Sequence, residues 1–515
     1  MTKRSEGRVG EEMPENLKQQ ATAGVQWQGA TTAFQVIARL VVGVALARLL
    51  PPEDFGMVGF ALIFTEFLTL FSELGVGAAL VQRQEISPVH LRVGFTLSVL
   101  LGSVATLLLW WLAPRLATGT TLAAMQAVSL SLLLTSVGTV STALLYRHLD
   151  FRRLFFVELI SYLPGYALVT VALAARGYRV WSLVAGVLVQ ASLRLILLSG
   201  FAPHSRKPSF SAAETRDLLG FGVGMTLARL ANYVARNVDY LVVGQFLGPT
   251  ALGLYLRAYA LGIGSTTQLT SLMTTVLFPL FARSQSDLAR TKRWYLQANN
   301  LVSMVAVPIL TLLALTAPEV LRGIYGPAWS AAAVPLQFFC VAAMFRCLNT
   351  LSDALVRAHA QVYRQFFRHL AYAALVSAGA LAGLRWGISG AAAGVSLAVV
   401  VMFVLMSRLS LEVTRASWME LLATLRMGVV LGLGVGATCA LTVWLLRSAR
   451  TPDLLVVLVT GMVAGLTTLA GLRSLPASWC SEALSPLMVT FLPRRWLNWF
   501  LGPATGGPEK SDLAP

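Results

Sequence analysis

Charged residues at helical spacing inside apolar stretches are the part of this sequence best suited to chemistry. Glu66 and Glu73 lie seven residues apart in a stretch that is otherwise apolar enough to sit in lipid. Arg346 and Asp353 repeat the same seven-residue spacing in a later stretch. Residues seven apart share one face of a helix, so each pair forms a polar stripe. Because a charge near the bilayer centre costs roughly 2.5–3.5 kcal/mol, such a stripe must face away from lipid.

A third stripe combines both signs of charge. Arg236 and Asp239 stand at i and i+3, where they can pair, and Arg229 precedes Arg236 by seven residues. Arg39 adds a cation to the first apolar stretch. The arginines suit an anionic cargo, because the guanidinium group matches phosphate geometry.

Two interpretations of these stripes remain open. In the first, they line a water-filled central cavity. The substrate-cavity candidates are Arg39, Arg229, Arg236 and Arg346. The candidates for ion coupling or charge balance are Glu66, Glu73, Asp239 and Asp353. In the second interpretation, the stripes pair with one another as structural ion pairs. Arg194, Glu158 and Arg257 are expected to lie near a membrane edge and to snorkel.

Composition indicates the elements that position these residues. The 515-residue chain is 56% hydrophobic and 12% charged, whereas soluble domains carry about 25% charged residues. A soluble fold of this size could not bury so much apolar surface. The net charge of +17 does not indicate nucleic acid binding, because the cations fall mostly in short loops between apolar runs. We therefore expect an all-α polytopic integral membrane protein.

Because a helix needs roughly 20 apolar residues to span the bilayer core, the sequence predicts about fourteen transmembrane helices. They are 24–47, 55–80, 93–113, 122–145, 154–175, 180–200, 218–247, 251–281, 295–317, 330–356, 365–384, 388–407, 427–446 and 454–472. Polar residues dilute 330–356 and 365–384 most. The excess of cations in alternate loops places both termini in the cytoplasm.

An internal repeat divides these helices into two lobes. LARLLPPEDFG, ending at Gly56, resembles VGQFLGPTALG, ending at Gly253, six spans later. Two parallel six-helix repeats are typical of transporters. In the first bend, Pro51 and Pro52 end one helix and Asp54 can cap the next. The predicted parts are a cytoplasmic N-tail 1–22, an N-lobe 23–200, a linker 201–216, a C-lobe 217–411, a helix pair 425–472 and a cytoplasmic tail 473–515 with an interfacial segment.

Several kinds of enzyme site are missing from the sequence. It has no GxxxxGK[ST] loop for ATP, no GxSxG and no metal-binding constellation. The cysteines form no CxxC pair, and Cys340, Cys347 and Cys439 lie in apolar runs as expected for small core residues, while Cys480 does not. The sequence therefore predicts a transporter without catalytic residues, metal or cofactor.

Two motifs carry a family resemblance. ARLLPPEDFGMVGFALIFTEFLTLFSELGVGAALVQRQE and, in the second lobe, NVDYLVVGQFLGPTALGLYLRAY resemble the polysaccharide-export branch of the multidrug/oligosaccharidyl-lipid/polysaccharide exporter superfamily. The chain is most similar to colanic-acid-type oligosaccharide flippases over roughly residues 20–470. The resemblance implies a two-lobed flippase of the bacterial inner membrane that works by alternating access. Its substrate would be an undecaprenyl-diphosphate-linked oligosaccharide repeat unit, bound in a cationic cavity and moved with the help of an ion gradient.

The resemblance also implies possible partners, namely polysaccharide polymerase and export machinery. The internal symmetry favours a monomer. The main alternative is a peptidoglycan lipid II flippase of the same superfamily. A drug or cation exporter is disfavoured by the extra C-terminal helix pair. An O-antigen ligase or polymerase is disfavoured because no outer loop is large, and a membrane scaffold because intramembrane charges would be a needless cost.

Overall fold

We describe the chain from a computed structural model, in which residues 15–474 are placed. This part of the chain is helical and contains no strand, which confirms the all-α fold class. The predicted interfacial tail segment and Cys480 lie outside the described residues.

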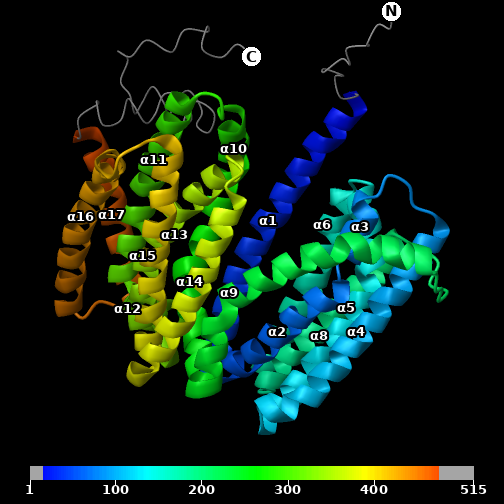
Figure 1. The fold of residues 1–515 in the computed structure, drawn as a ribbon. Helices are drawn as coiled ribbons and strands as arrows, with labels where there is room; N and C mark the ends of the chain where they lie inside the picture. The colour runs from blue at the N-terminus through cyan, green and yellow to red at the C-terminus, as the bar shows by residue number, and fades with distance from the viewer. Residues whose placement is uncertain (1–14, 475–515) are drawn as a thin grey trace, which may run out of the picture. The chain divides into compact units, whose positions relative to one another are not determined.

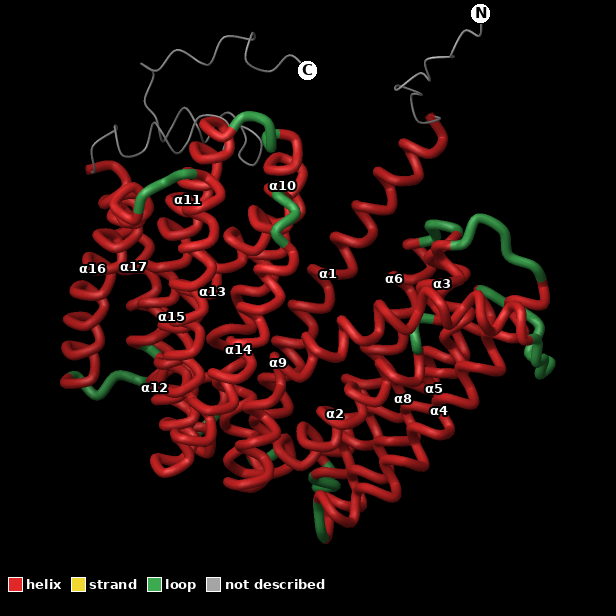
Figure 2. The backbone as a smooth tube through the Cα atoms, in the orientation of Figure 1, coloured by secondary structure: helices red, strands yellow, loops and turns green. Residues whose placement is uncertain are grey.

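The helices follow one another with short connections (Figures 1 and 2). The α-helices are α1 (Glu15–Leu49), α2 (Pro52–Glu73), α3 (Val76–Gln82), α4 (Pro88–Leu116), α5 (Gly119–Arg147), α6 (Phe151–Ile160), α7 (Val169–Ala175), α8 (Val180–Phe201), α9 (Ala212–Tyr259), α10 (Ser265–Arg283), α11 (Leu288–Leu315), α12 (Ala317–Val320), α13 (Ala333–Ala358), α14 (Val362–Gly383), α15 (Gly387–Thr414), α16 (Trp418–Ser448) and α17 (Asp453–Ser474). Wider π-helical turns occupy Ser161–Leu168, Ala260–Gly264 and Leu321–Tyr325, and 3₁₀ turns occupy Pro327–Ala332 and Leu384–Trp386.

Eleven helical stretches of the described chain are long and apolar enough to cross a membrane. One of them, Tyr363–Thr414, holds both α14 and α15, and the diluted spans 330–356 and 365–384 are covered by this set. The predicted spans 218–247 and 251–281 are not among these eleven stretches of the described chain. The count of fourteen therefore stays a prediction.

Both copies of the repeated motif mark a break between helices. Pro51 has an extended backbone between α1 and α2. Gly248 interrupts α9 with φ 83° and ψ 179°, a conformation that glycine adopts without a side-chain penalty, and Pro249 follows it. The expected capping role of Asp54 is wrong, because no side chain caps α2. The buried carboxylate of Asp54 instead accepts hydrogen bonds from Arg179 at 3.3 Å, which compensates its loss of hydration.

The chain divides into two compact units, one up to Tyr233 and one from Val234. The core of unit 1 is formed by α2, α4, α5 and α8, where Leu109, Met125 and Leu132 are fully buried. The first part of α9 belongs to this unit, since Leu218 packs with Val76 and Val140. The division into compact units thus falls inside α9, and the predicted lobes with their linker 201–216 stay a prediction.

Unit 2 contains a closely packed pair of helices, α14 and α15, and a C-terminal group formed by α11, α16 and α17. α14 and α15 meet through glycines: a methyl group on Gly379 would lie 2.6 Å from the carbonyl oxygen of Gly394, and one on Gly383 would meet that of Gly390. Such small-residue contacts allow two membrane helices to approach closely. The C-terminal helices α16 and α17 also belong to this unit, because α16 packs along α11 and α17 packs on α16 (Figure 1).

Candidate functional site

In unit 1, the polar stripe of α2 faces the first part of α9. The Tyr233 hydroxyl donates to the carbonyl oxygen of Ile63 at 2.7 Å and to Glu66 Oε2 at 3.5 Å. One turn earlier on α9, Arg229 Nη1 lies 3.9 Å from Glu73 Oε2. The seven-residue spacing of the two glutamates is therefore matched by partners four residues apart on α9. Both partners of the Glu73–Arg229 pair remain more than a third exposed, so the pair contributes little to stability.

Beside this pair lies a cavity of about 830 Å³ between helices of unit 1. Its charged lining residues are Glu73, Arg194 and Arg229, and threonines such as Thr135 and Thr142 add hydroxyl groups. The remaining lining is largely apolar and mixes large side chains, such as Leu134 and Phe151, with small residues such as Gly77 and Gly138. The lining carries two guanidinium groups and one carboxylate, and Glu158 outside the lining lies 3.0 Å from Arg194. The guanidinium groups suit an anionic headgroup.

Arg194 was expected to snorkel to the membrane edge together with Glu158. Instead, Arg194 Nη2 lies 3.0 Å from Glu158 Oε1 while Arg194 also lines the cavity. Gln35 Nε2 of α1 donates to the other carboxylate oxygen of Glu158 at 3.4 Å. Glu158 therefore holds a cavity arginine from outside the cavity lining. Its position near the end of a predicted helix did not indicate in the sequence that Arg194 lines a cavity and pairs with Glu158.

Arg39, the cavity candidate of the predicted N-lobe, lies on α1 with an exposed side chain. Its charge is close enough to act on Glu66 and Tyr162. It is not among the residues that line the 830 Å³ cavity.

In unit 2, Asp239 and Arg346 belong to one cluster of phenol groups. The Tyr255 hydroxyl donates to Asp239 Oδ2 at 2.9 Å, and Arg346 Nη1 of α13 donates to the Tyr259 hydroxyl at 3.1 Å. Tyr240 stands edge-on to both tyrosines, at 6.0 and 5.1 Å between ring centroids. Asp239 is only 1% exposed, and its Oδ1 has no hydrogen-bond partner among the described residues.

The third residue of that predicted stripe is oriented differently. The side chain of Arg236 is exposed, and in the described part of the chain it forms no ion pair with Asp239. The i, i+3 spacing permitted that pair, but the buried carboxylate is satisfied by Tyr255 instead. Tertiary packing thus decided the partner.

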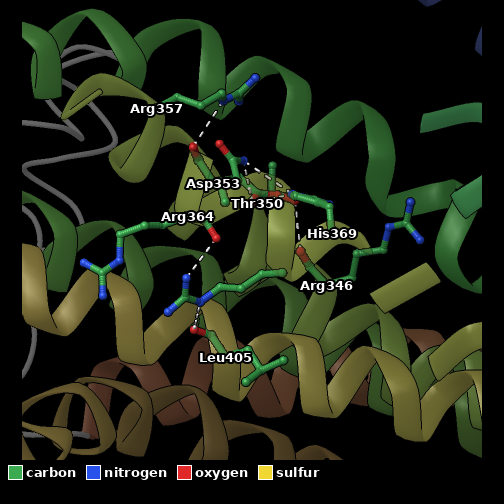
Figure 3. Close-up of polar contacts among 9 residues, drawn as sticks. Arg346, Thr350, Asp353, Arg357, Arg364, His369 and Leu405 are labelled. Carbon is green, nitrogen blue, oxygen red and sulfur yellow. Dashed lines mark hydrogen bonds and ion pairs between the residues drawn. The ribbon is translucent and has the colours of Figure 1, made fainter. Parts of the chain in front are cut away.

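Asp353 lies two turns beyond Arg346 on α13 and meets α14 (Figure 3). Its Oδ1 accepts a hydrogen bond from Gln365 Nε2 at 3.0 Å and lies 3.2 Å from His369 Nε2. In Figure 3 the Arg357 guanidinium also reaches back to the backbone of Asp353, where its Nε donates to the carbonyl oxygen at 3.2 Å. Gln365 and His369 stand at i and i+4 on α14, a spacing that places them on one face. The sequence analysis did not identify them, because nothing in α14 indicates which helix that face meets.

Other expected features have simpler outcomes. Arg257 stacks on the rings of Tyr325 and Trp329, at 5.1 and 5.2 Å from their centroids. Cys340, Cys347 and Cys439 are buried free thiols, as expected for small core residues. Residues 15–474 contain no cluster of three or more His, Cys, Asp or Glu residues that could hold a metal ion.

Comparisons with known proteins give the family. A family profile described as "Polysaccharide biosynthesis protein" matches residues 45–334. The lipopolysaccharide biosynthesis protein WzxC of Escherichia coli (strain K12) is 27% identical over 379 residues, covering 72% of this chain and 77% of that protein. The succinoglycan biosynthesis transport protein ExoT of Rhizobium meliloti (strain 1021) is 29% identical over 315 residues, 60% of this chain and 63% of that protein. The teichuronic acid biosynthesis protein TuaB of Bacillus subtilis (strain 168) is 22% identical over 360 residues, which cover 68% of this chain and 74% of that protein.

Solved structures share the fold. The lipid II flippase MurJ in an inward closed conformation aligns with a TM-score of 0.66 at 14% identity, over 87% of this chain and 98% of that one. An inward-facing multidrug resistance MATE family transporter of the MOP superfamily aligns with a TM-score of 0.56 at 16% identity, over 74% of this chain and 96% of that one. Because the family profile covers more than half of the sequence, the chain belongs to the family described as polysaccharide biosynthesis protein, and it shares the fold of these two solved structures.

Proposed function

We propose that this protein is a flippase for undecaprenyl-diphosphate-linked oligosaccharide repeat units. It moves them by alternating access from the cytoplasmic to the periplasmic leaflet of the bacterial inner membrane, where they are built into O-antigen, capsule or exopolysaccharide. The observation that carries the proposal is the family membership, together with relatives named for the biosynthesis of three different polysaccharides.

The cavity of unit 1 supports an anionic cargo. A sugar–diphosphate headgroup cannot cross hydrocarbon unaided, because its charges would lose their hydration. Arg194 and Arg229 can replace part of that hydration with charge-assisted hydrogen bonds, and the threonines of the lining can bind sugar hydroxyls. Glu73 competes with the headgroup for Arg229 across the 3.9 Å pair. The polyprenyl chain would remain in the lipid throughout.

Uphill transport also requires an energy source, and the acidic residues supply candidate positions for it. Glu66 and Glu73 are accessible in unit 1, while Asp239 and Asp353 lie in unit 2. The unpartnered Oδ1 of Asp239 is a place where a proton or a cation could bind. We further infer that both termini are cytoplasmic, that the chain acts as a monomer, and that a polymerase consumes its product.

The test is transport in proteoliposomes with lipid-linked oligosaccharide extracted from the host. An impermeant sugar-modifying enzyme scores sidedness, and H⁺ and Na⁺ gradients are imposed separately. We expect the sugar to become accessible only in vesicles that contain the protein. The same accessibility in protein-free vesicles, or no movement under either gradient, would contradict the proposal.

Lipid II is the second candidate substrate. The fold match with MurJ favours it, although 14% identity shows a shared fold alone. Running lipid II in parallel separates the candidates: transport of lipid II without the oligosaccharide substrate would replace our proposal with the alternative.

A further inference from the structure

Three arginines and one glutamate lie together where α14 begins and α15 ends. They are Arg364, Arg368, Arg408 and Glu412. Arg364 Nη2 lies 2.5 Å from Glu412 Oε2, and Arg408 Nε lies 3.4 Å from Glu412 Oε1. Glu412 is therefore shared between a cation of each helix. These arginines are among the cations whose excess in alternate loops predicts a cytoplasmic position.

Arg368 is held between the same two helices without an acidic partner. Its Nε donates to the carbonyl oxygen of Leu405 at 3.2 Å, and its Nη1 donates to that of Arg364 at 2.8 Å (Figure 3). Among the described residues no carboxylate lies within ion-pair distance of Arg368. Three guanidinium groups and one carboxylate leave two net positive charges in this cluster. This excess positive charge can attract an external anion.

An apolar groove lies on the same hairpin, with its lining beginning seven residues from Arg368 on α14 and from Arg408 on α15. It encloses about 720 Å³ between walls that include Leu375, Trp386, Leu397 and Val401. Its lining also contains the four contact glycines and small alanines: Gly379, Gly383, Gly390, Gly394, Ala378, Ala382, Ala393 and Ala398. The groove exists because these small residues leave the surface hollow where the two backbones meet.

Helical spacing aligns the groove with the arginines. Leu375 follows Arg368 by seven residues on α14, and Arg408 follows Val401 by seven on α15, so both arginines share a face with a groove wall. Seven residues of helix correspond to about 10 Å. Next to Arg364, the side chains of Tyr363, Phe366 and Phe367 are exposed, as is typical of aromatic residues at a membrane–water interface.

We propose that this surface, the hairpin lipid site formed by Arg364, Arg368, Arg408 and the groove, binds one anionic phospholipid of the bilayer. The phosphate lies among the arginines, whose net charge it offsets, and one acyl chain fills the groove. Basic clusters beside membrane helices on the cytoplasmic side suit anionic headgroups, each arginine contributing about 1 kcal/mol, or about a fivefold change in affinity. A bilayer phospholipid is present in large excess over any lipid-linked intermediate, so mass action favours it as occupant. This site does not depend on the proposed substrate.

The experiment measures lipid retention by native mass spectrometry and thermal unfolding of the purified protein in a neutral detergent. Dioleoylphosphatidylglycerol is the probe, and dioleoylphosphatidylcholine has the same chains without net charge. We expect one bound phosphatidylglycerol and a higher melting temperature, with a weaker effect of phosphatidylcholine. Arg368→Gln/Arg408→Gln should bind about 30-fold more weakly, from two arginines at about fivefold each.

Two further variants separate binding from folding. Arg385→Gln removes a charge at the opposite end of α14 and should bind phosphatidylglycerol like the wild type. Ala378→Leu fills the groove without touching the arginines and should also weaken retention. Equal binding by the wild type and the double arginine variant would overturn the proposal, as would equal binding of phosphatidylcholine. Equal stabilisation by inorganic phosphate would remove the role of the groove, and one-for-one displacement by undecaprenyl diphosphate would make the substrate the occupant.

Discussion

The charged side chains of the two units differ in how close their partners within the protein are and in how exposed they remain. In unit 1, Glu73 and Arg229 are 3.9 Å apart, remain partly exposed and line a cavity. In unit 2, Asp239 is 1% exposed and bound by Tyr255 at 2.9 Å, and Arg346 is bound by Tyr259. The Glu73–Arg229 pair of unit 1 is thus longer and more exposed than the contacts of Asp239 and Arg346 in unit 2, although Arg194 of unit 1 is paired with Glu158 at 3.0 Å.

This difference separates residues that can bind a ligand from residues that hold a helix contact. A side chain whose hydrogen bonds are already made inside the protein must break them before it can bind a cargo. The long, partly solvated pair of unit 1 costs little to open. We therefore propose that unit 1 makes the diphosphate contacts and that unit 2 has a structural or ion-binding role, which the following changes can test.

The largest effect is expected from removing both cavity arginines. Arg194→Gln/Arg229→Gln deletes two charge-assisted contacts with the headgroup, each worth about 1.5–3 kcal/mol, so the transport rate at low substrate should fall by roughly 10²- to 10⁴-fold. Initial rates in the proteoliposome assay measure this loss, normalised to the folded protein in each preparation.

Glu158→Gln is the matched control for that variant. It removes the partner of Arg194 at 3.0 Å but keeps both guanidinium groups in the cavity. It should retain most transport. If the control loses as much activity as the double arginine variant, the effect reflects the Arg194–Glu158 contact, and the cavity assignment fails.

A smaller effect, on stability, is expected in unit 2. Tyr255→Phe leaves a carboxylate oxygen of Asp239 buried without its donor, which should lower the free energy of unfolding by about 1–3 kcal/mol. Transport per folded molecule should change much less. Reversible denaturation of the purified protein and the transport assay measure the two quantities separately.

Tyr240→Phe serves as the comparison, because the ring contacts with Tyr255 and Tyr259 are kept while a hydroxyl group is lost. It should be closer to the wild type in stability than Tyr255→Phe. Were Tyr255→Phe to unfold like the wild type yet lose its dependence on an ion gradient, the unit 2 cluster would be an ion-coupling site instead of a helix contact.

The sequence allowed the helical class, the two bends and the polar stripes to be predicted, because each depends on residues close together in the chain. Apolar length indicates spanning helices, proline and glycine indicate breaks, and a seven-residue spacing indicates one face. The glycines that join α14 to α15 are visible in the same way, as pairs four residues apart.

The partners of those stripes could not be predicted, because they come from distant parts of the chain. Glu73 meets Arg229, Asp353 meets His369 and Asp54 meets Arg179 only through tertiary packing. Where a local partner was available, as for Arg236 and Asp239, burial selected a phenol from another turn instead. Spacing within a helix therefore identifies a polar face but not what it contacts.

The smallest effect is expected from Glu73→Gln, which removes the acidic member of the unit 1 pair. Because the pair is long and partly solvated, the free energy of unfolding should change by less than about 1 kcal/mol. The same change frees Arg229 from its competitor, so the apparent affinity for an anionic headgroup should rise by up to about fivefold, the equivalent of that energy. Substrate titration of the transport rate measures it. A loss of stability as large as that of Tyr255→Phe would mean that the Glu73–Arg229 contact holds the helices together. The charged contacts of the two units would then not differ in their contribution to stability.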